Sequence, residues 1–169
     1  MAGEFQRLQR WFWRLQEPGP APGLRLGNGD DALAVATDRP VVISVDTLVD
    51  STHVLAGTAP EDIAAKALRS ALSDLVAMGA DPWFYTLSLV VPGEYPDDWW
   101  ERFSSALLAE NHNWGCPCLG GDTTRGPVLV VTVQVHGLAD HPVTRSGMRP
   151  GDDLWLLGSV GDAAAGLSL

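Results

Sequence analysis

The sequence predicts an α+β fold in which helices cover one face of a mixed β-sheet. The expected elements follow the order β, α, β, α, β, β, which is typical of α+β sandwiches. The expected strands are apolar with little alternation, so both faces of the sheet need cover. The chain has 169 residues, and 46 % of them are apolar, which is enough for the core of one domain.

The first expected element is an amphipathic helix at Glu4–Leu15, because its large apolar residues recur at helical spacing. The Pro- and Gly-rich stretch Glu17–Gly23 is interpreted as a linker. Gly27–Asp31 is a glycine turn that ends in paired carboxylates. The β-branched run Val41–Val45 predicts a buried strand, too apolar to be exposed.

Two long helices have clear start signals. Thr58 is the expected cap of the first, Pro60 lies in its first turn, and we expect it to run to about Met78. The second opens at Tyr95–Asp98, again with Pro and acidic residues in the first turn, and runs to about His112. Both helices are long enough to cover a sheet face.

The remaining strands are apolar runs bounded by Gly and Pro. We expect them at Trp83–Val91, Cys116–Leu119, Val128–Val135 and Leu154–Leu157. Gly161 and Asp162 then open an Ala-rich helix. We find no internal repeat.

The charge balance limits the classes of partner. The net charge is −10, from 21 acidic and 11 basic residues, and Lys66 is the only lysine. This argues against general nucleic-acid binding, which needs a basic face. It suits a protein whose carboxylates are partly neutralised by divalent cations.

The cysteines and the N-terminal region indicate a cytoplasmic protein. Cys116 and Cys118 are too close for an easy mutual disulfide and too few for a zinc site, so we expect reduced thiols. Met1–Arg14 is charged and lacks the apolar core of a signal peptide. No apolar run approaches the length of a membrane span, so no membrane partner is expected.

Four acidic positions on separate elements are candidate ligands for magnesium, which prefers hard oxygen donors. Asp30 lies in the glycine turn, Asp46 follows a strand, Asp74 lies near the apolar face of a helix, and Asp122 lies between two strands. If these positions converge, they fit a nucleotide–magnesium site. Lys66, Arg69 or a helix terminus could instead satisfy Asp74.

The stretch Leu119–Pro127, LGGDTTRGP, combines features of a phosphate-binding loop. Its two glycines permit close approach of the backbone to a ligand, and Arg125 is a cation suited to phosphate oxygens. We expect a turn between two buried strands. The simpler alternative is a glycine hairpin with a solvated Asp122. There is no Walker lysine motif and no protein-kinase signature.

Several long stretches together resemble the N-terminal part of the thiamine-monophosphate kinase family, within the superfamily of aminoimidazole-ribonucleotide and selenophosphate synthetases. In addition to LGGDTTRGP, they are GDDALAV at Gly29–Val35, SVDTLVDSTHV at Ser44–Val54, the long stretch at Pro60–Pro82, and RSGMRPGDDLWLLGSVGDAAAGLSL at Arg145–Leu169. They follow in the right order and span nearly the whole chain from Gly27 onward.

The resemblance implies transfer of the ATP γ-phosphate onto thiamine monophosphate, with Mg²⁺ as cofactor and no covalent nucleophile. It implies magnesium ligands at Asp30, Ser44, Val45, Asp46, Asp74 and Asp122. It also implies ATP contacts at Gly121, Asp122 and Arg145, and a substrate contact at His53. Val45 stands where the family usually has Thr, so there a backbone carbonyl would serve the metal. Ser51 and Thr52 replace a pair that usually contains Gly.

The resemblance further implies a homodimer, in which the second sheet face packs on another copy and closes a barrel. It divides the chain into an N-terminal helix and linker (1–26), an ATP- and magnesium-binding domain (27–150) and the start of a truncated second domain (151–169). We therefore expect this chain alone to bind nucleotide weakly, if at all, and not to turn over, because half a cleft cannot hold both reactants in line. A sister ATP-dependent synthetase and a non-catalytic nucleotide-binding or dimerisation module remain alternatives.

Overall fold

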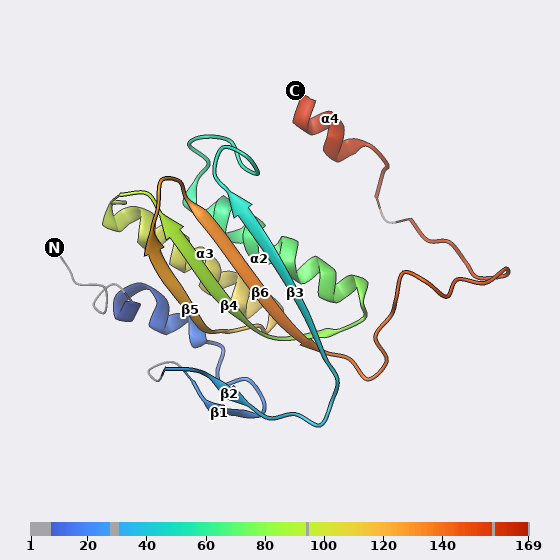
Figure 1. The fold of residues 1–169 in the computed structure, drawn as a ribbon. Coiled ribbons are helices and arrows are strands. Elements are labelled where there is room, and N and C mark those ends of the chain that lie inside the picture. The colour runs from blue at the N-terminus through green and yellow to red at the C-terminus, as the bar shows by residue number, and fades with distance from the viewer. Residues whose placement is uncertain (1–7, 28–30, 94, 157, 169) are drawn as a thin grey trace.

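The computed structural model describes residues 8–27, 31–93, 95–156 and 158–168. Its centre is a four-stranded mixed sheet of strand order β3-β6-β4-β5, with helices α2 and α3 packed on one face (Figure 1). The elements are β3 (Val41–Val49), α2 (Pro60–Ala77), β4 (Asp81–Val91), α3 (Asp97–Trp114), β5 (Cys118–Arg125) and β6 (Val130–Leu138). This confirms the predicted α+β fold.

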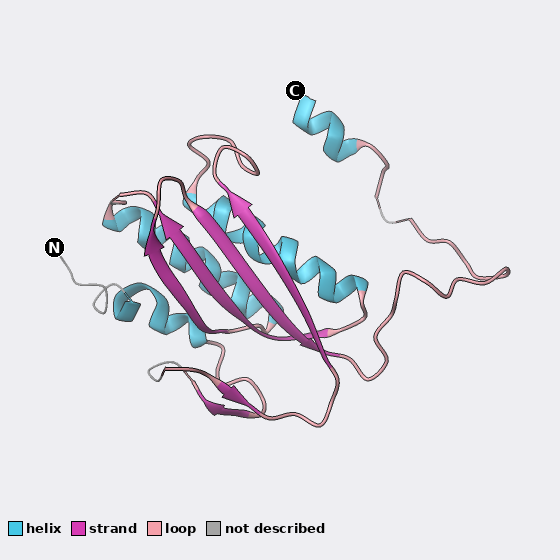
Figure 2. Ribbon diagram, viewed as in Figure 1, coloured by secondary structure: helices cyan, strands magenta, loops and turns pink. Residues whose placement is uncertain are grey.

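The N-terminal region packs beside the sheet as short helical turns followed by a small hairpin (Figure 2). Leu8–Phe12 forms a π-helical turn and Trp13–Gln16 a 3-10 turn, where a regular helix was expected at Glu4–Leu15. Residues 4–7 of that prediction lie outside the described residues. The hairpin pairs β1 (Leu24–Leu26) with β2 (Ala34–Val35).

The strand pairing corrects the prediction for Leu119–Pro127. Most of this stretch is strand β5, and the turn is confined to the residues between Arg125 and Val130. Helix α3 carries the chain back across the sheet, so β5 pairs parallel with β4. β4 then lies between β5 and β6, which excludes the glycine hairpin. Glycines are tolerated in β5 because it is an edge strand with only one hydrogen-bonded neighbour.

The open face of the sheet corrects the prediction that Val41–Val45 is buried. Side chains of β3 alternate, and Val41, Ile43 and Val45 are 40 %, 54 % and 55 % exposed. Ser44, Asp46 and Leu48 therefore point to the opposite face, where α2 packs. The side chains of β3 alternate between the two faces of the sheet, and both faces carry apolar residues. A strand with this pattern is typical of a sheet that is covered on both faces.

The two long helices match their predicted bounds closely, apart from the cap of α2. Ala59 occupies the N-cap position, and Thr58 Oγ1 instead donates a hydrogen bond to the Leu55 carbonyl at 2.7 Å. The helices are joined by a bidentate ion pair in which the Arg69 guanidinium donates to both oxygens of Glu110, at 2.8 and 2.7 Å.

A buried hydrogen-bond network ties the N-terminal turns to this core. Tyr85 OH donates to Asn111 Oδ1 at 2.9 Å, and Asn111 Nδ2 donates to the Leu15 carbonyl at 2.6 Å. Leu15, Tyr85 and Asn111 are all fully buried. The position of the N-terminal turns is therefore fixed by polar groups that have no water to replace them.

After β6 the chain leaves the body of the sheet (Figure 1). The predicted strand at Leu154–Leu157 is not formed over residues 154–156, where Leu154 and Trp155 are highly exposed, and residue 157 lies outside the described residues. The predicted helix is present as α4 (Asp162–Ser168). None of the described helices combines the length and the apolar character needed to cross a bilayer.

Candidate functional site

The first group of predicted site residues lies between β3 and α2. Ser44 Oγ donates a hydrogen bond of 2.5 Å to Asp74 Oδ2. Asp74 is exposed rather than close to the buried face, contrary to its helical spacing. Among the described residues no basic side chain is paired with it, since Lys66 binds the His53 carbonyl and Arg69 binds Glu110. Asp74 is therefore an accessible carboxylate oriented by a hydroxyl.

A small cavity of about 140 Å³ adjoins this group. Its lining includes Asp46, His53, Lys66 and Ser70. The backbone N–H of Val49 donates to His53 Nδ1 at 2.9 Å, so the proton of the neutral ring lies on Nε2. Lys66 Nζ donates to the backbone carbonyl of the same histidine. A cation and an imidazole N–H donor thus lie beside Asp46 of β3, and such donors suit a phosphate group.

The loop that holds His53 contains Ser51 in a left-handed conformation, with φ of 59°. Non-glycine residues adopt this region at a steric cost. Asp50 Oδ1 accepts the Ser51 N–H at 2.9 Å, which supports the turn. Ser51, one of the two residues that replace the usual Gly-containing pair, thus lies at a position where glycine would be unstrained.

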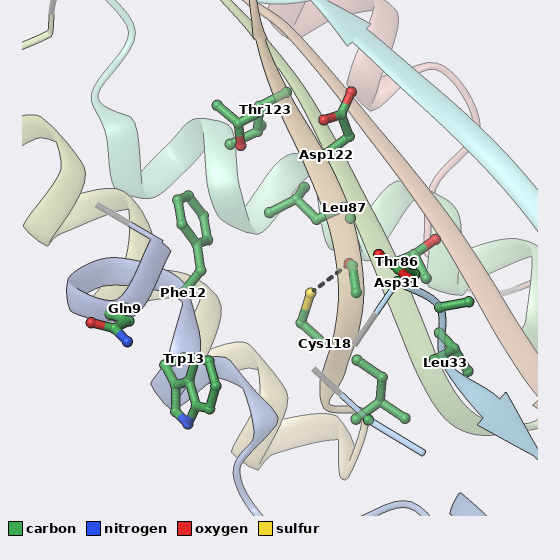
Figure 3. Close-up of a pocket in the computed structure, with 16 residues that line it drawn as sticks. Gln9, Phe12, Trp13, Asp31, Leu33, Thr86, Leu87, Cys118, Asp122 and Thr123 are labelled. Carbon is green, nitrogen blue, oxygen red and sulfur yellow. Dashed lines mark hydrogen bonds between the residues drawn. The ribbon is translucent and has the colours of Figure 1, made fainter. Parts of the chain in front are cut away.

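The second group lies at the β5 edge, where a pocket of about 540 Å³ separates this strand from the N-terminal region (Figure 3). Gly120, Gly121 and Asp122 line it from β5, and Asp31 lines it from the segment between β1 and β2. A side chain at Gly121 would collide with the backbone of Leu87, so the two strands can approach only because this residue is glycine.

Cys118 also lines this pocket without being a nucleophile. Burial raises the pKa of its thiol to about 12. The sulfur therefore stays protonated at neutral pH, and it donates to the Gly120 carbonyl. Cys116 is likewise a free, buried thiol.

The two groups do not meet within one copy of the chain. Asp46 lies on β3 and Asp122 on β5, at opposite edges of the sheet, with β6 and β4 between them. Three strand spacings amount to about 14 Å. Among the described residues no three acidic, histidine or cysteine side chains lie close enough to share a metal ion.

Three further predicted residues lie apart from these groups. Val45 points to the open face of the sheet. Arg145 lies in the exposed segment that follows β6. Asp30 lies outside the described residues.

The residues that sequence reasoning missed belong to the N-terminal turns. Gln9, Phe12 and Trp13 form one wall of the larger pocket. The helical spacing assigned Phe12 to packing and gave Trp13 no role. A signal was present in the sequence, because Trp13 is two residues from both Trp11 and Leu15, and side chains at that spacing do not share a helix face. In the structure Trp13 is 51 % exposed, whereas Trp11 and Leu15 are buried.

Comparison with known proteins agrees with this architecture. The family model described as AIR synthase related protein, N-terminal domain, matches residues 29–139. The chain belongs to this family. The matched residues include all four strands of the mixed sheet and the two helices that cover it.

Among its relatives are thiamine-monophosphate kinases. The enzymes of Salmonella typhimurium and Escherichia coli strain K12 are each 42 % identical over 99 % of this chain and 51 % of their own length. The chain thus spans about half the length of the curated relatives it matches. The crystal structure of thiamine-monophosphate kinase from Stenotrophomonas maltophilia K279a aligns with a TM-score of 0.79 at 36 % identity, over 92 % of this chain and 49 % of that one.

A further solved structure, AaThiL complexed with AMPPCP and TMP, aligns with a TM-score of 0.74 at 28 % identity, covering 83 % of this chain and 46 % of that one. The hydrogenase maturation protein HypE in complex with ATP aligns with a TM-score of 0.72 at 20 % identity, which shows a shared fold alone.

Proposed function

We propose that this chain provides the ATP- and magnesium-binding part of a thiamine-monophosphate kinase, which transfers the γ-phosphate of ATP to thiamine monophosphate and forms thiamine diphosphate. The observation that carries the proposal is the 42 % identity over 99 % of the chain to enzymes of that name. A solved relative in complex with AMPPCP, a non-hydrolysable ATP analogue, and TMP supports the same pair of substrates. The likeness to HypE favours no competing activity, because it extends to the fold alone.

The donor set fits magnesium as the cofactor. Asp74 and Ser44 offer oxygen atoms beside β3, and Asp46 and Asp122 offer carboxylates on the edge strands β3 and β5. We assign Asp30, Ser44, Val45 through its carbonyl, Asp46, Asp74 and Asp122 to Mg²⁺, which when bound neutralises phosphate charge and aligns the transferred group.

The protein side chains supply positioning. Gly121, through its backbone, and Arg145 are assigned to the ATP phosphates. His53 donates through Nε2 and, beside Lys66, holds the phosphate of the acceptor. No side chain needs to form a covalent intermediate.

We further propose that the chain acts as a cytoplasmic homodimer with a composite site. The open face of β3 exposes Val41, Ile43 and Val45, and β3 and β5 are the two free edges of the sheet. If two copies pack through this face about a twofold axis along the strands, β3 of one copy lies beside β5 of the other. Within one sheet, Asp46 of β3 pairs with Val133 of β6, which pairs with Leu87 of β4, which in turn pairs with Gly121 of β5. Asp46 and Gly121 therefore lie at the same height along the strands. Such a dimer would place the β3 group of one copy beside the β5 group of the other.

Binding of Mg–ATP should raise the melting temperature of the chain by more than magnesium alone, because a ligand of the folded state stabilises it by mass action. Asp46→Asn and Asp74→Asn should each remove most of this rise, while Asp98→Asn, an exposed acid at the start of α3, should keep it. A full Mg–ATP shift in both variants would refute the site.

Formation of thiamine diphosphate by the full-length protein, with no other product, separates the kinase from a sister synthetase.

Light scattering at micromolar concentration should give the mass of a dimer. Val45→Glu places a charge on the open face and should produce monomers, because it would bury a carboxylate without a partner. Val76→Glu is the matched control, since Val76 is 62 % exposed on α2 at the opposite face, and it should stay dimeric. A monomer mass for the wild-type chain would contradict the homodimer.

A further inference from the structure

The pocket beside β5 has two ends of different chemistry. Asp122 and Thr123 supply oxygen atoms from β5, whereas Phe12 and Trp13 supply apolar surface from the N-terminal turns (Figure 3). The volume of about 540 Å³ lies in the range of sites for small organic ligands. A ligand that matches this division has a flat apolar ring at one end and an anionic, metal-binding group at the other.

The aromatic end is built on an anchored segment. Leu15 is two residues beyond Trp13, and its carbonyl accepts a hydrogen bond of 2.6 Å from the fully buried side chain of Asn111. Gln16 Nε2 donates to the Trp13 carbonyl at 3.3 Å. Phe12 packs edge-on against Trp100, with ring centroids 5.8 Å apart. The backbone of this wall is thus fixed, while about half of the Trp13 side chain remains open to a ligand.

An exposed indole in a pocket is a stacking platform for a heteroaromatic ring. Gln9 lies on the same wall, and its amide presents a donor and an acceptor side by side. That pair matches the adjacent N6 and N7 groups of adenine. The Asp122 carboxylate at the other end matches the magnesium-bound phosphates of the same molecule.

We propose that this pocket binds the base of the nucleotide, with Trp13 stacked on the purine ring and Gln9 hydrogen-bonded to its edge. The assignment rests on the proposed function for the phosphate end and adds the residues that select the base. It places base recognition on the N-terminal turns, which precede the part of the chain matched by the family model.

The test compares Mg–ATP with Mg–tripolyphosphate, which carries the phosphates without a base. Trp13→Ala should weaken the Kd of Mg–ATP about tenfold, since stacking on an aromatic side chain is worth about that much, and leave the Kd of Mg–tripolyphosphate within about twofold. Trp13→Phe should recover most of the loss. Trp155→Ala, which removes an 88 % exposed indole outside the pocket, should bind both ligands as the wild type does.

The outcomes distinguish the two proposals. If the wild-type chain binds Mg–ATP more tightly than Mg–tripolyphosphate and Trp13→Ala keeps that preference, the base assignment is overturned and the phosphate site stands. If Trp13→Ala weakens both ligands equally, Trp13 supports the fold and the assignment is again overturned. If calorimetry detects neither ligand with the wild-type chain, the proposed function fails and the base assignment fails with it.

Discussion

Gly121→Ala is expected to destabilise the chain by roughly 3 kcal/mol, near the upper end of the cost of adding a methyl group to a packed interior. The added carbon would lie closer than the van der Waals distance to three backbone atoms of Leu87, which are its carbonyl oxygen, its carbonyl carbon and its amide nitrogen. These are backbone atoms of the neighbouring strand, so no side-chain rotation relieves the clash. β5 must move away from β4, which also displaces Asp122. Urea denaturation measures the loss.

Gly27→Ala is the matched control for this substitution. Gly27 lines the same pocket, but a side chain there would meet only the flexible Leu24 and Gln16 side chains, at 3.4 and 3.8 Å. We expect a change below about 0.5 kcal/mol, as for ordinary surface substitutions. Equal free energies of unfolding for wild type and Gly121→Ala would show that β5 does not need glycine at this position.

Arg69→Ala is expected to cost about 2–3 kcal/mol. The Glu110 side chain is only 6 % exposed, and removal of the guanidinium leaves its carboxylate with the Trp114 indole N–H as a remaining donor. The hydrogen bonds from Arg69 lower the pKa of Glu110 below its ordinary value of 4.5. The stabilisation is therefore present above pH 4.5 and is lost as the pH falls through the lowered pKa.

The difference in the free energy of unfolding between wild type and Arg69→Ala should accordingly become smaller at acidic pH. Arg102→Ala provides the comparison, because its partners Glu61 and Asp98 are 44 % and 77 % exposed. Exposed pairs contribute up to about 1 kcal/mol, so this variant should stay close to wild type. A cost for Arg69→Ala no larger than that for Arg102→Ala would show that burial of Glu110 adds nothing to the ion pair.

The order of elements was predictable because the signals for α2 and α3 are local. Pro60 and the acids that follow it mark a helix start whatever the tertiary context. The nature of β5 was not predictable from its own residues, since Gly120–Arg125 has the composition of a turn. Its strand conformation depends on pairing with β4, which lies more than thirty residues earlier. Parallel pairing leaves no short-range signal.

The acidic residues proposed for the site could be named from the sequence, whereas their arrangement could not. The resemblance pointed to Asp46 and Asp122, and the apolar runs before them indicated strand ends. That placement was wrong, because β3 continues to Val49 and β5 to Arg125, so both residues lie within strands. Their separation follows from the strand order β3-β6-β4-β5, a non-local property that no periodicity encodes. The exposure of Val45 has the same origin, because a hydrophobic pattern cannot tell whether the cover of a sheet face belongs to the same chain.

The two free edges of the sheet carry a hazard of fibre growth. β3 offers unpaired backbone groups next to exposed Ile43 and Val45, and β5 is a second edge of the same kind. If β5 of each copy joined β3 of the next without closing a ring, copies would add indefinitely. Asp46 and Asp122 give both edges the same charge, and like charges on adjacent strands repel. In the absence of a cation this repulsion would oppose such growth.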